Sequence, residues 1–505
     1  MSPVATPLPE PVAAQLAAVV GRQHLRVGDE ILPEYGHDEA LSLPPHVPDV
    51  VVLPGSTDEV ARIVEVARAL AVPVTARGSA TGLSGGCLPG HGGIVVSFER
   101  MDRILSIDTA NHAAVVQPGV TLAQLNVALA EHHLTYPVAP GEDSASLGGT
   151  VATNAGGMRA VRHGVTRQHV TGLQIVTGTG AVVRLGGMVT KASSGYDLVQ
   201  LVVGSEGTLA LITEVTVRVV GILDHAATVV APFPTLEGAT SVVPTLLESG
   251  LQPSIVEYID QLSMAGVTEH AGIELAIPEK ERASALAYLV IVVEQRTRDR
   301  LDEDVEELAG LLEAQGATNT YVLAPSAGAG LVRAREQAFW AAKAAGADDI
   351  VDVVVPRAAI APFIESVGAL AAAAASLVIG CGHAGDGNVH LSVFQPDPAI
   401  RHRLVGDMLT AGKALGGLIS GEHGIGVAKK PYFAELEDPV HLDLLAGIKA
   451  AFDPAGILNP GTTIDPIDPI DPAGHRDLAG PAHPVDPVHR GGGGIRHPGA
   501  QAPAR

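Results

Sequence analysis

The 505-residue chain lacks the features that mark nucleic-acid-binding, membrane-spanning and disulfide-bonded proteins. Its formal net charge is −23, whereas nucleic acids and anionic membranes bind basic surfaces. Its two cysteines, Cys87 and Cys381, form no CxxC pair, which excludes a disulfide framework and a cysteine-ligated iron–sulfur cluster. The first residues do not resemble a secretory signal, and the longest small-apolar run, 367–379, is too short to span a bilayer. We therefore expect a cytoplasmic protein without nucleic-acid partners or a transmembrane segment.

Small and apolar residues are abundant instead. Hydrophobic residues make up 46% of the chain, and its length allows at least two domains with their own cores. Residues 1–45 are expected to be a leader with one short helix, and the Pro-, Gly- and His-rich residues 463–505 a disordered tail. Between them, changes in residue pattern divide the folded part into segments 46–224, 225–415 and 416–462.

Segment 46–224 begins with a β-α-β unit and contains three small-residue tracts. Strands are predicted at 50–53 and 72–76, with the capping box Ser56-Thr57-Asp58-Glu59 opening the helix between them. The tracts at 77–86, 144–157 and 204–208 are rich in Gly, Ser and Thr, whose small size lets backbone N–H groups approach a phosphate. One such tract can be an ordinary loop. Three in one segment indicate an extended, phosphate-bearing cofactor.

Segment 225–415 alternates strands and helices, which predicts an α+β domain with helices over one antiparallel sheet. The expected strands are 228–231, 254–258, 288–293, 320–323 and 350–355, and the expected helices are 238–247, 301–315 and 359–374. In segment 416–462, the spacing of Leu442, Leu445 and Ile448 predicts one further helix with these residues on one face.

A histidine hairpin is predicted at residues 380–391. Apolar runs flank Asp386-Gly387, a dipeptide typical of two-residue hairpin turns. This register would place His383 directly opposite His390, with Cβ atoms roughly 4.5–5.5 Å apart on one face. Two imidazoles so placed can share a metal ion.

Gly421-Glu422-His423-Gly424 supplies a carboxylate and a third imidazole farther along the chain. Two His and one Glu are a known ligand set of catalytic zinc, which leaves one position open. His383, His390 and Glu422 are therefore the predicted ligands of one divalent ion, most simply zinc. The alternative interpretation is a polar hairpin with two exposed histidines.

In their order along the chain, the three tracts, the histidine hairpin, Gly421-Glu422-His423-Gly424 and the ending Ile457-Leu458-Asn459-Pro460-Gly461 resemble flavoproteins that oxidise D-2-hydroxy acids. That family includes the glycolate oxidase catalytic subunit, FAD-linked D-lactate dehydrogenase and D-2-hydroxyglutarate dehydrogenase. The resemblance covers residues 45–462. It implies an α+β protein with a two-subdomain FAD-binding domain of the vanillyl-alcohol-oxidase (PCMH) type. An α+β cap domain with an antiparallel sheet would follow, and then a C-terminal helical segment returning to the flavin.

The resemblance also implies the residues that contact FAD. Those expected at the pyrophosphate are Arg77, Gly78, Ser79, Ala80, Thr81 and Gly82. Those expected along the flavin and ribityl chain, or closing the site, are Pro140, Ser144, Gly148, Gly149, Asn154, Gly157, Glu206, Ile212 and Asn459. The FAD should be non-covalent, because relatives that tether the flavin use a His or Cys in or near the first loop. Residues 77–86 contain no His, and Cys87 lies after the loop.

Three positions depart from the family pattern. The family usually has Gly at the position of Ala80, which matters only if φ there is positive, and Asn at the position of Ser392. The hydroxyglutarate enzyme has a lysine at the position of Ile350 that binds the distal carboxylate. Its absence favours a short monocarboxylate such as D-lactate or glycolate.

The implied reaction is oxidation of the 2-hydroxy acid to a 2-oxo acid. FAD N5 would take the hydride, and the metal would lower the pKa of the hydroxyl. His423 is the candidate base, and its side chain should diverge from that of Glu422 if the segment is extended. Arg335 matches the family arginine that pairs the substrate carboxylate; without the resemblance it would be read as an exposed helix arginine.

Electrons would pass to a separate acceptor: a quinone, an electron-transfer protein or an iron–sulfur subunit. A location at the membrane periphery, through a partner, is left open beside the cytoplasmic one. A homodimer is one assembly that the sequence leaves open. Other hypotheses are a D-2-hydroxyglutarate dehydrogenase, a non-catalytic FAD-binding subunit of a larger oxidase, a redox-neutral flavin enzyme such as an ether-lipid synthase, and a metal-free nucleotide-binding protein. The last three give no reason for His383, His390, Glu422 and His423 together.

Overall fold

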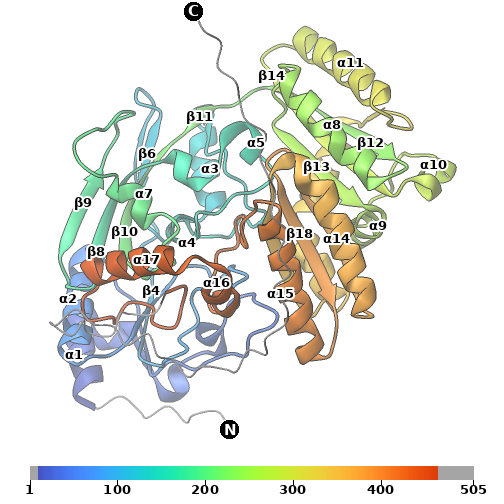
Figure 1. Cartoon of the computed structure of the whole chain (residues 1–505). Coiled ribbons are helices and arrows are strands. Elements are labelled where there is room, and N and C mark those ends of the chain that lie inside the picture. The colour runs from blue at the N-terminus through green and yellow to red at the C-terminus, as the bar shows by residue number, and fades with distance from the viewer. Residues whose placement is uncertain (1–9, 465–505) are drawn as a thin grey trace, which may run out of the picture. The chain divides into compact units, whose positions relative to one another are not determined.

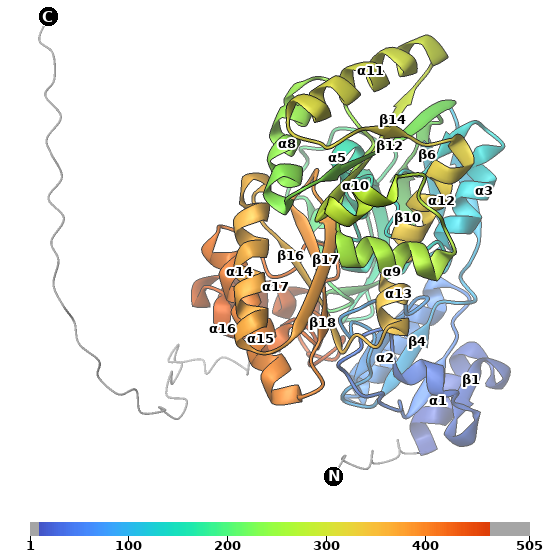
Figure 2. The ribbon, with the colours of Figure 1, turned by 90° about the vertical axis from the view of Figure 1, so that its right-hand side faces the viewer.

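The computed structural model describes residues 10–464, and Figures 1 and 2 show them in two views. Residues 1–9 of the expected leader and nearly all of the expected tail lie outside the described residues. Three larger β-sheets and a two-stranded one organise the described chain. No helix among residues 10–464 is long and apolar enough to cross a membrane.

The first sheet contains the predicted β-α-β unit. Its strands, in spatial order, are β1 (Leu25–Val27), β2 (Val50–Val52), β4 (Ile94–Ser97) and β3 (Val74–Arg77). Strands β2, β4 and β3 are parallel. Helix α2 (Thr57–Ala69) begins after Ser56, whose hydroxyl accepts a hydrogen bond from the Glu59 N–H at 3.2 Å, so the predicted N-cap is confirmed. The reciprocal half of the capping box differs, because the Glu59 carboxylate accepts the Gly55 N–H at 2.7 Å and not that of Ser56. Helix α1 (Glu10–Val20) packs against α2. The first small-residue tract leaves the carboxyl end of β3.

The second sheet is antiparallel. Its strands, in spatial order, are β5 (Ile104–Asp108), β6 (Ala113–Val116), β10 (Ala210–Arg218), β8 (Val170–Thr177) and β9 (Val182–Gly186). Helices α3 (Leu122–Ala130), α4 (Leu147–Thr153) and α7 (Leu198–Val202) pack on its core. Smaller elements here are β7 (Leu134–Thr135) paired with β11 (Val220–Gly221), α5 (Ala160–His163) and α6 (Thr166–His169). The second and third tracts lie at the start of α4 and just before β10.

The third sheet is the predicted antiparallel sheet of segment 225–415. Its strands, in spatial order, are β15 (Tyr321–Val322), β12 (His225–Phe233), β14 (Ala287–Gln295), β13 (Ile255–Asp260), β17 (Leu377–His383), β18 (Asn388–Phe394) and β16 (Asp349–Val354). Helices on one side are α8 (Leu236–Glu248), α11 (Arg298–Ala314), α14 (Ile360–Ala373) and α15 (Pro398–Ala414). Helices on the other are α9 (Gln261–Ala271), α12 (Pro325–Glu336) and α13 (Ala338–Ala344). Helices thus pack on both faces, where one covered face was expected.

Alternation in the central strands separates an apolar face from a polar one. Val351 and Val353 of β16 are buried in the core under α14 and α15, whereas Asp352 between them points the other way. In β13, Val256 and Tyr258 join the same core, and Glu257 points away from it. The chemistry-bearing residues of this sheet therefore share its second face.

The predicted hairpin forms, but its register is wrong. β17 and β18 place His383 opposite Asn388, and His390 opposite Cys381. Residues 384–387 form a four-residue turn, because only Gly387 of the expected Asp-Gly pair has a positive φ (89°), and the expected turn needs two. The register differs by two residues, which keeps both histidines on one face. Their ring centroids lie 4.8 Å apart.

The predicted C-terminal helix is α17 (Pro439–Phe452), and α16 (Lys430–Leu436) precedes it. Beyond α17 the chain returns to the first sheet, where the Val74 N–H donates to Ile457 O and the Asn459 N–H to Val74 O, both at 2.8 Å. The remaining short elements are α10 (Glu279–Ser284) and the 3₁₀ helices η1 (Arg22–His24), η2 (Gly28–Glu30), η3 (Pro33–Gly36) and η4 (Arg357–Ala359).

Candidate active site

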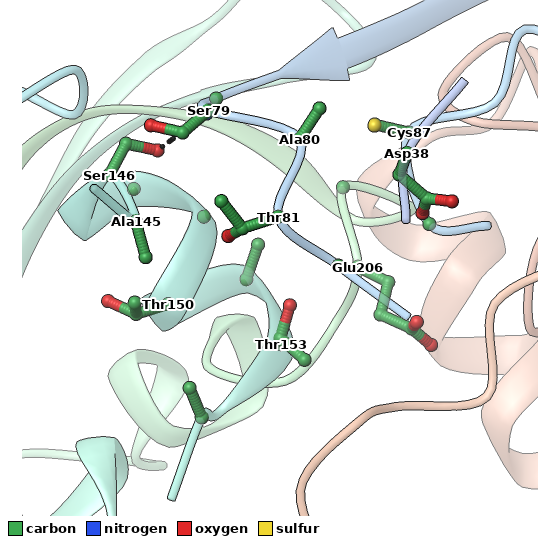
Figure 3. Close-up of a pocket in the computed structure, with 18 of the residues that line it drawn as sticks. Asp38, Ser79, Ala80, Thr81, Cys87, Ala145, Ser146, Thr150, Thr153 and Glu206 are labelled. Atoms are coloured by element: carbon green, nitrogen blue, oxygen red, sulfur yellow. Dashed lines mark hydrogen bonds between the residues drawn. The ribbon is translucent and has the colours of Figure 1, made fainter. Parts of the chain in front are cut away.

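The three small-residue tracts meet around one cavity (Figure 3). It contains about 1250 Å³ of empty space, part of it open to solvent. Most residues predicted to contact the cofactor line it: Gly78, Ser79, Ala80, Thr81, Gly82, Pro140, Gly148, Gly149, Glu206 and Ile212. Glu422 and His423, from a distant part of the sequence, complete the wall.

Five predicted contacts do not line the cavity: Arg77, Ser144, Asn154, Gly157 and Asn459. Ser144 is exposed, and its hydroxyl donates to Glu142 at 2.7 Å. Asn154 ends α4 with φ 56°, and Gly157 has φ 119° against the Ala139 carbonyl. These residues shape the neighbouring backbone.

Close approach of neighbouring side chains explains two of the glycines in the cavity wall. A Cβ on Gly78 would lie 2.1 Å from Ser146 Oγ, and one on Gly148 would lie 2.5 Å from Pro118 Cβ. The Ser146 hydroxyl instead accepts the Ser79 N–H at 3.2 Å, which joins the first tract to the second. Ala80 has φ 56°, so the position where the family usually has Gly is a left-handed one.

Glu206 and Asn459 connect the tracts to the segment that carries Glu422. The side-chain amide of Asn459 donates to Gly86 O and Glu206 O, both at 2.7 Å. The Glu206 carboxylate accepts the N–H groups of Ile425 at 3.2 Å and Gly426 at 2.9 Å. Burial raises the pKa of Glu206.

The three predicted metal ligands come together as one compact donor set. His383 Nε2 lies 3.1 Å from His390 Nε2 and 3.2 Å from Glu422 Oε1, and His390 Nε2 lies 3.1 Å from the same oxygen. In a tetrahedral zinc site with bonds of 2.0–2.1 Å, neighbouring donors are roughly 3.3–3.4 Å apart. The triangle therefore fits three ligands of one ion and leaves a fourth position open. Both histidines are largely buried, so the interpretation as exposed hairpin histidines is wrong.

Glu257 orients the first of these ligands. Its Oε1 lies 2.6 Å from His383 Nδ1, which puts the proton on that nitrogen and leaves Nε2 free as a ligand. Its Oε2 lies 2.7 Å from an Arg335 terminal nitrogen. Arg335 is buried at 6% exposure, so it is not an exposed helix arginine. Neither Arg335 nor the two histidines line the cavity, but Glu422, which contacts both histidines, does.

The carboxylates around the triangle favour positive charge there, which a protonated imidazole or a metal ion can supply. Burial opposes a charged His383, yet Glu257 and Glu422 raise the pKa of its imidazole well above the usual value. Burial likewise opposes an ionised Glu422, yet His383 and His390 hold the pKa of that carboxyl well below its usual range.

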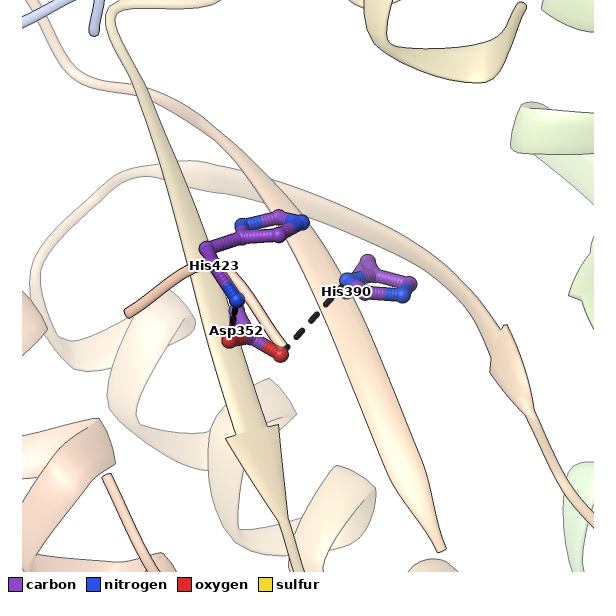
Figure 4. Close-up of side chains that lie close together, drawn as sticks. All are labelled: Asp352, His390 and His423. Atoms are coloured by element: carbon purple, nitrogen blue, oxygen red, sulfur yellow. Dashed lines mark hydrogen bonds and ion pairs between the residues drawn. The ribbon is translucent and has the colours of Figure 1, made fainter. Parts of the chain in front are cut away.

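Asp352 fixes the loop that supplies Glu422 and His423 (Figure 4). Its Oδ2 accepts the backbone N–H groups of residues 421, 422 and 423 at 2.9–3.0 Å, and the Ser420 hydroxyl at 2.8 Å. Its Oδ1 accepts from the Asn388 amide at 2.7 Å. Asp352, His390 and His423 also form a second cluster of possible ligands. Because donors already occupy both Asp352 oxygens, the His383–His390–Glu422 set is the better metal site.

The expected divergence of Glu422 and His423 is wrong. His423 Nε2 lies 3.9 Å from Glu422 Oε1, and the His423 ring stacks on His390 with centroids 5.0 Å apart. Three consecutive N–H groups directed at one oxygen require a curled backbone, whereas divergence assumes an extended one. Burial lowers the pKa of His423 to about 4.

The sequence interpretation missed Glu257, Asp352 and Asp38, a cavity-lining residue that the expected leader supplies. Glu257 and Asp352 had a readable signal. Each is a carboxylate between apolar neighbours inside a strand, and a buried charge needs a partner. Asp38 lies in irregular, Pro-rich chain and had none.

Comparison with known proteins agrees with this geometry. Residues 48–186 match the family described as FAD binding domain, and residues 222–463 the family described as FAD linked oxidases, C-terminal domain. An uncharacterised FAD-linked oxidoreductase of Mycobacterium tuberculosis is 51% identical, with 89% of this chain and 98% of that protein covered. D-lactate dehydrogenase of Anaerostipes hadrus is 35% identical, with 88% of this chain and 95% of that protein covered.

Among solved structures, p-cresol methylhydroxylase with substrate bound has the same fold. The TM-score is 0.73 at 16% identity, with 90% of this chain and 96% of that chain covered. The predicted PCMH-type fold with an α+β second domain is therefore confirmed. The chain belongs to the family of FAD-linked oxidoreductases that includes D-lactate dehydrogenase and the glycolate oxidase subunit.

Proposed function

We propose that this protein oxidises a short D-2-hydroxy monocarboxylate, such as D-lactate or glycolate, to the 2-oxo acid. It would use non-covalent FAD and one divalent ion, most simply zinc, and pass the electrons to a separate acceptor. The observation that carries the proposal is the position of Glu422, which is both a corner of the donor triangle and part of the cavity wall. The A. hadrus relative named D-lactate dehydrogenase supports the substrate class.

The residues present fit both groups. The tracts give the cavity a wall of small residues, and two His nitrogens with a carboxylate oxygen suit zinc. When bound, FAD supplies a hydride acceptor and the ion supplies a Lewis acid for the substrate hydroxyl. The chain would hold the ion through His383, His390 and Glu422, with Glu257 fixing the first imidazole.

His423 would take the hydroxyl proton. Its Nδ1 is buried and has no hydrogen-bond partner in residues 10–464, and its ring lies at the cavity wall. With its pKa lowered by burial to about 4, the imidazole is neutral near pH 7, as a proton acceptor must be. Its stacking on His390 keeps the ring beside the donor triangle.

Arg335 would bind the substrate carboxylate with the donors that Glu257 leaves free. Its Nε is buried and has no hydrogen-bond partner in the described chain. A guanidinium has donors enough to serve Glu257 on one edge and a carboxylate on another.

Ile350 supports a short substrate. It lies opposite Ser392, next to the Asp352–His390 pair on the same sheet face. A second cavity lies beside Ile350, and its lysine and arginine already have partners. Lys429 contacts Asp352 at 3.4 Å and Ser420 at 3.1 Å, and Arg401 donates to the Gln395 carbonyl at 2.7 Å. Burying a second substrate carboxylate without a cation would cost on the order of several kcal/mol.

The low reactivity of the cysteine thiol that follows the first tract supports non-covalent FAD. Cys87 lines the cavity, but burial raises its pKa to about 12, so it is not a reactive thiolate. Denaturation should release all yellow colour, and flavin fluorescence on the protein band of a denaturing gel would contradict this.

The test is dye-linked turnover of the FAD-loaded protein on D- and L-2-hydroxy acids, with elemental analysis of bound metal. We expect D-lactate or glycolate to exceed D-2-hydroxyglutarate in kcat/KM. His390→Ala should lose metal and turnover but keep FAD, whereas the control His402→Ala, which stacks on Tyr432 outside the triangle, should keep all three. An equal metal content in wild type and His390→Ala would contradict the metal site. A higher kcat/KM for D-2-hydroxyglutarate than for D-lactate or glycolate would contradict the proposed substrate.

A further inference from the structure

Residues 35–43, the strap, lie across the first small-residue tract although they precede the matched FAD-binding domain. The Arg77 guanidinium donates to the His37 carbonyl at 2.8 Å and lies over the Tyr35 ring at 5.6 Å. The Glu39 N–H donates to the Gly82 carbonyl at 2.9 Å. The strap is therefore fixed to both ends of the loop from 77 to 82.

Asp38 is the residue of the strap that reaches the cavity (Figure 3). It is 6% exposed, and its Oδ1 accepts the Ala40 N–H at 3.1 Å. Its Oδ2 is buried and accepts no hydrogen bond of ordinary geometry in the described residues, although the Gly85 N–H lies near enough to the carboxylate to lower its pKa. Leaving such an oxygen unpaired costs on the order of 1–3 kcal/mol, so a ligand donor is the expected partner.

We propose that Asp38 is a cofactor-binding residue whose Oδ2 accepts a hydrogen bond from a hydroxyl or N–H group of bound FAD. The pyrophosphate is excluded as its neighbour, because two anions would repel. The ribityl and ribose hydroxyls and the ring N–H groups are the donors that FAD offers. Burial raises the pKa of Asp38 to about 6, while the Ala40 and Gly85 N–H groups and Arg77 lower it, so the carboxylate is an acceptor near pH 7.

The proposal rests on FAD binding, which family membership shows, and not on the proposed substrate or metal. Its test therefore measures cofactor affinity without turnover. FAD-free protein is titrated with FAD, and flavin fluorescence gives Kd for wild type, Asp38→Ala and Asp38→Asn. The matched control is Glu39→Gln, because the neighbouring Glu39 carboxylate pairs with Lys343 and does not line the cavity.

Loss of a charge-assisted hydrogen bond should raise Kd roughly tenfold or more in Asp38→Ala. The rise should be smaller in Asp38→Asn, which keeps one acceptor oxygen, and Kd should be unchanged in Glu39→Gln. The melting temperature of the FAD-free protein should not fall in the Asp38 variants, because the buried oxygen that they remove or neutralise is unpaired before FAD binds. FMN, which lacks the adenosine half, is a second probe: weakened FMN binding assigns the contact to the flavin half, and unchanged binding to the adenosine half.

Unchanged Kd in both Asp38 variants would overturn the proposal and mean that water satisfies Oδ2. A fall in the melting temperature of FAD-free Asp38→Ala, together with unchanged FAD affinity in Asp38→Asn, would also overturn it, because Asp38 would then only support the strap.

Discussion

Glu257 and Asp352 each interrupt an apolar strand and lie on the face opposite the core. Their exposed fractions are 1% and 0%, so a charge at either position needs polar or charged partners. Glu257 has His383 and Arg335, and Asp352 has the loop at 421–423. The two carboxylates thus place an imidazole, a guanidinium and a carboxylate around one point.

Ala80 is a single-residue test of the cofactor loop. Its φ of 56° costs a non-glycine residue roughly 1–2 kcal/mol. Glycine would remove this cost, and the greater entropy that glycine gives the unfolded chain would cancel only part of the benefit. Ala80→Gly should therefore raise the free energy of unfolding by about 0.5–1 kcal/mol. Denaturant unfolding of the FAD-free protein measures the change.

The control for this prediction is Ala226→Gly in β12, an exposed strand position without a positive φ. There the same substitution should destabilise the protein by about 0.5–1 kcal/mol. Effects of the same sign at both positions would show that left-handed strain at Ala80 is not what glycine relieves.

At the scale of elements, the candidate active site is a hairpin facing a curled loop. β17 and β18 supply the two histidines, and the loop at 421–423 supplies Glu422 and His423. Neither element alone supplies all three corners of the donor triangle. The edge strand β16 lies beside β18 and gives Asp352 to the loop, so the sheet and the loop are positioned by one side chain.

Asp352→Asn should weaken metal binding about 10- to 100-fold while FAD stays bound. Donors face both Asp352 oxygens, so either orientation of an amide directs its NH₂ at another donor. The loop should then lose its fixed position, and Glu422 should leave the triangle. Metal titration of FAD-loaded protein measures the affinity.

Asp349→Asn is the matched control, because Asp349 lies in the same strand and accepts the Ile350 N–H at 2.9 Å, whereas the N–H groups of residues 421–423 donate to Asp352. Its metal affinity should equal that of wild type. Wild-type metal affinity in Asp352→Asn would show that the loop holds its position without this carboxylate.

The sequence predicted the elements well and their pairings less well. Periodicity and caps identified α2, the strands of the third sheet and the histidine hairpin, because these depend on local pattern. The turn of the hairpin was wrong by two residues, because Gly387 alone takes a positive φ. The partners of Asp352 lie 36 to 77 residues away, and the contact of Asp38 with the cavity is equally non-local. A local sequence pattern cannot predict contacts between residues so far apart in the chain.

At the scale of the whole described chain, the C-terminal segment packs against residues of the N-terminal half that form the cavity. Lys449 of α17 is 2% exposed and donates to Thr208 O and Leu458 O, both at 2.7 Å. It pairs with Asp453 Oδ2 at 2.5 Å, and that oxygen also accepts the Leu458 N–H at 2.7 Å. The next residue, Asn459, holds Gly86 and Glu206 at the cavity.

Lys449→Met should therefore weaken both the fold and the cofactor site. Removing one partner of a buried ion pair costs about 3–5 kcal/mol, because Asp453 is left buried and unpaired. FAD affinity should fall as well, since Asn459 is positioned by the same turn. Burial lowers the pKa of Lys449, whereas Asp453 raises it.

Lys413→Met is the matched control for this ion pair. Lys413 pairs with Glu437 at 3.1 Å, but the two side chains are 30% and 18% exposed, and such a pair is worth about 0–1 kcal/mol. The double variant Lys449→Met/Asp453→Asn should recover part of the lost stability, because it no longer buries an unpaired charge. If Lys449→Met and Lys413→Met lowered the melting temperature and the FAD affinity equally, the buried pair would not be what holds the C-terminal segment on the cofactor domain.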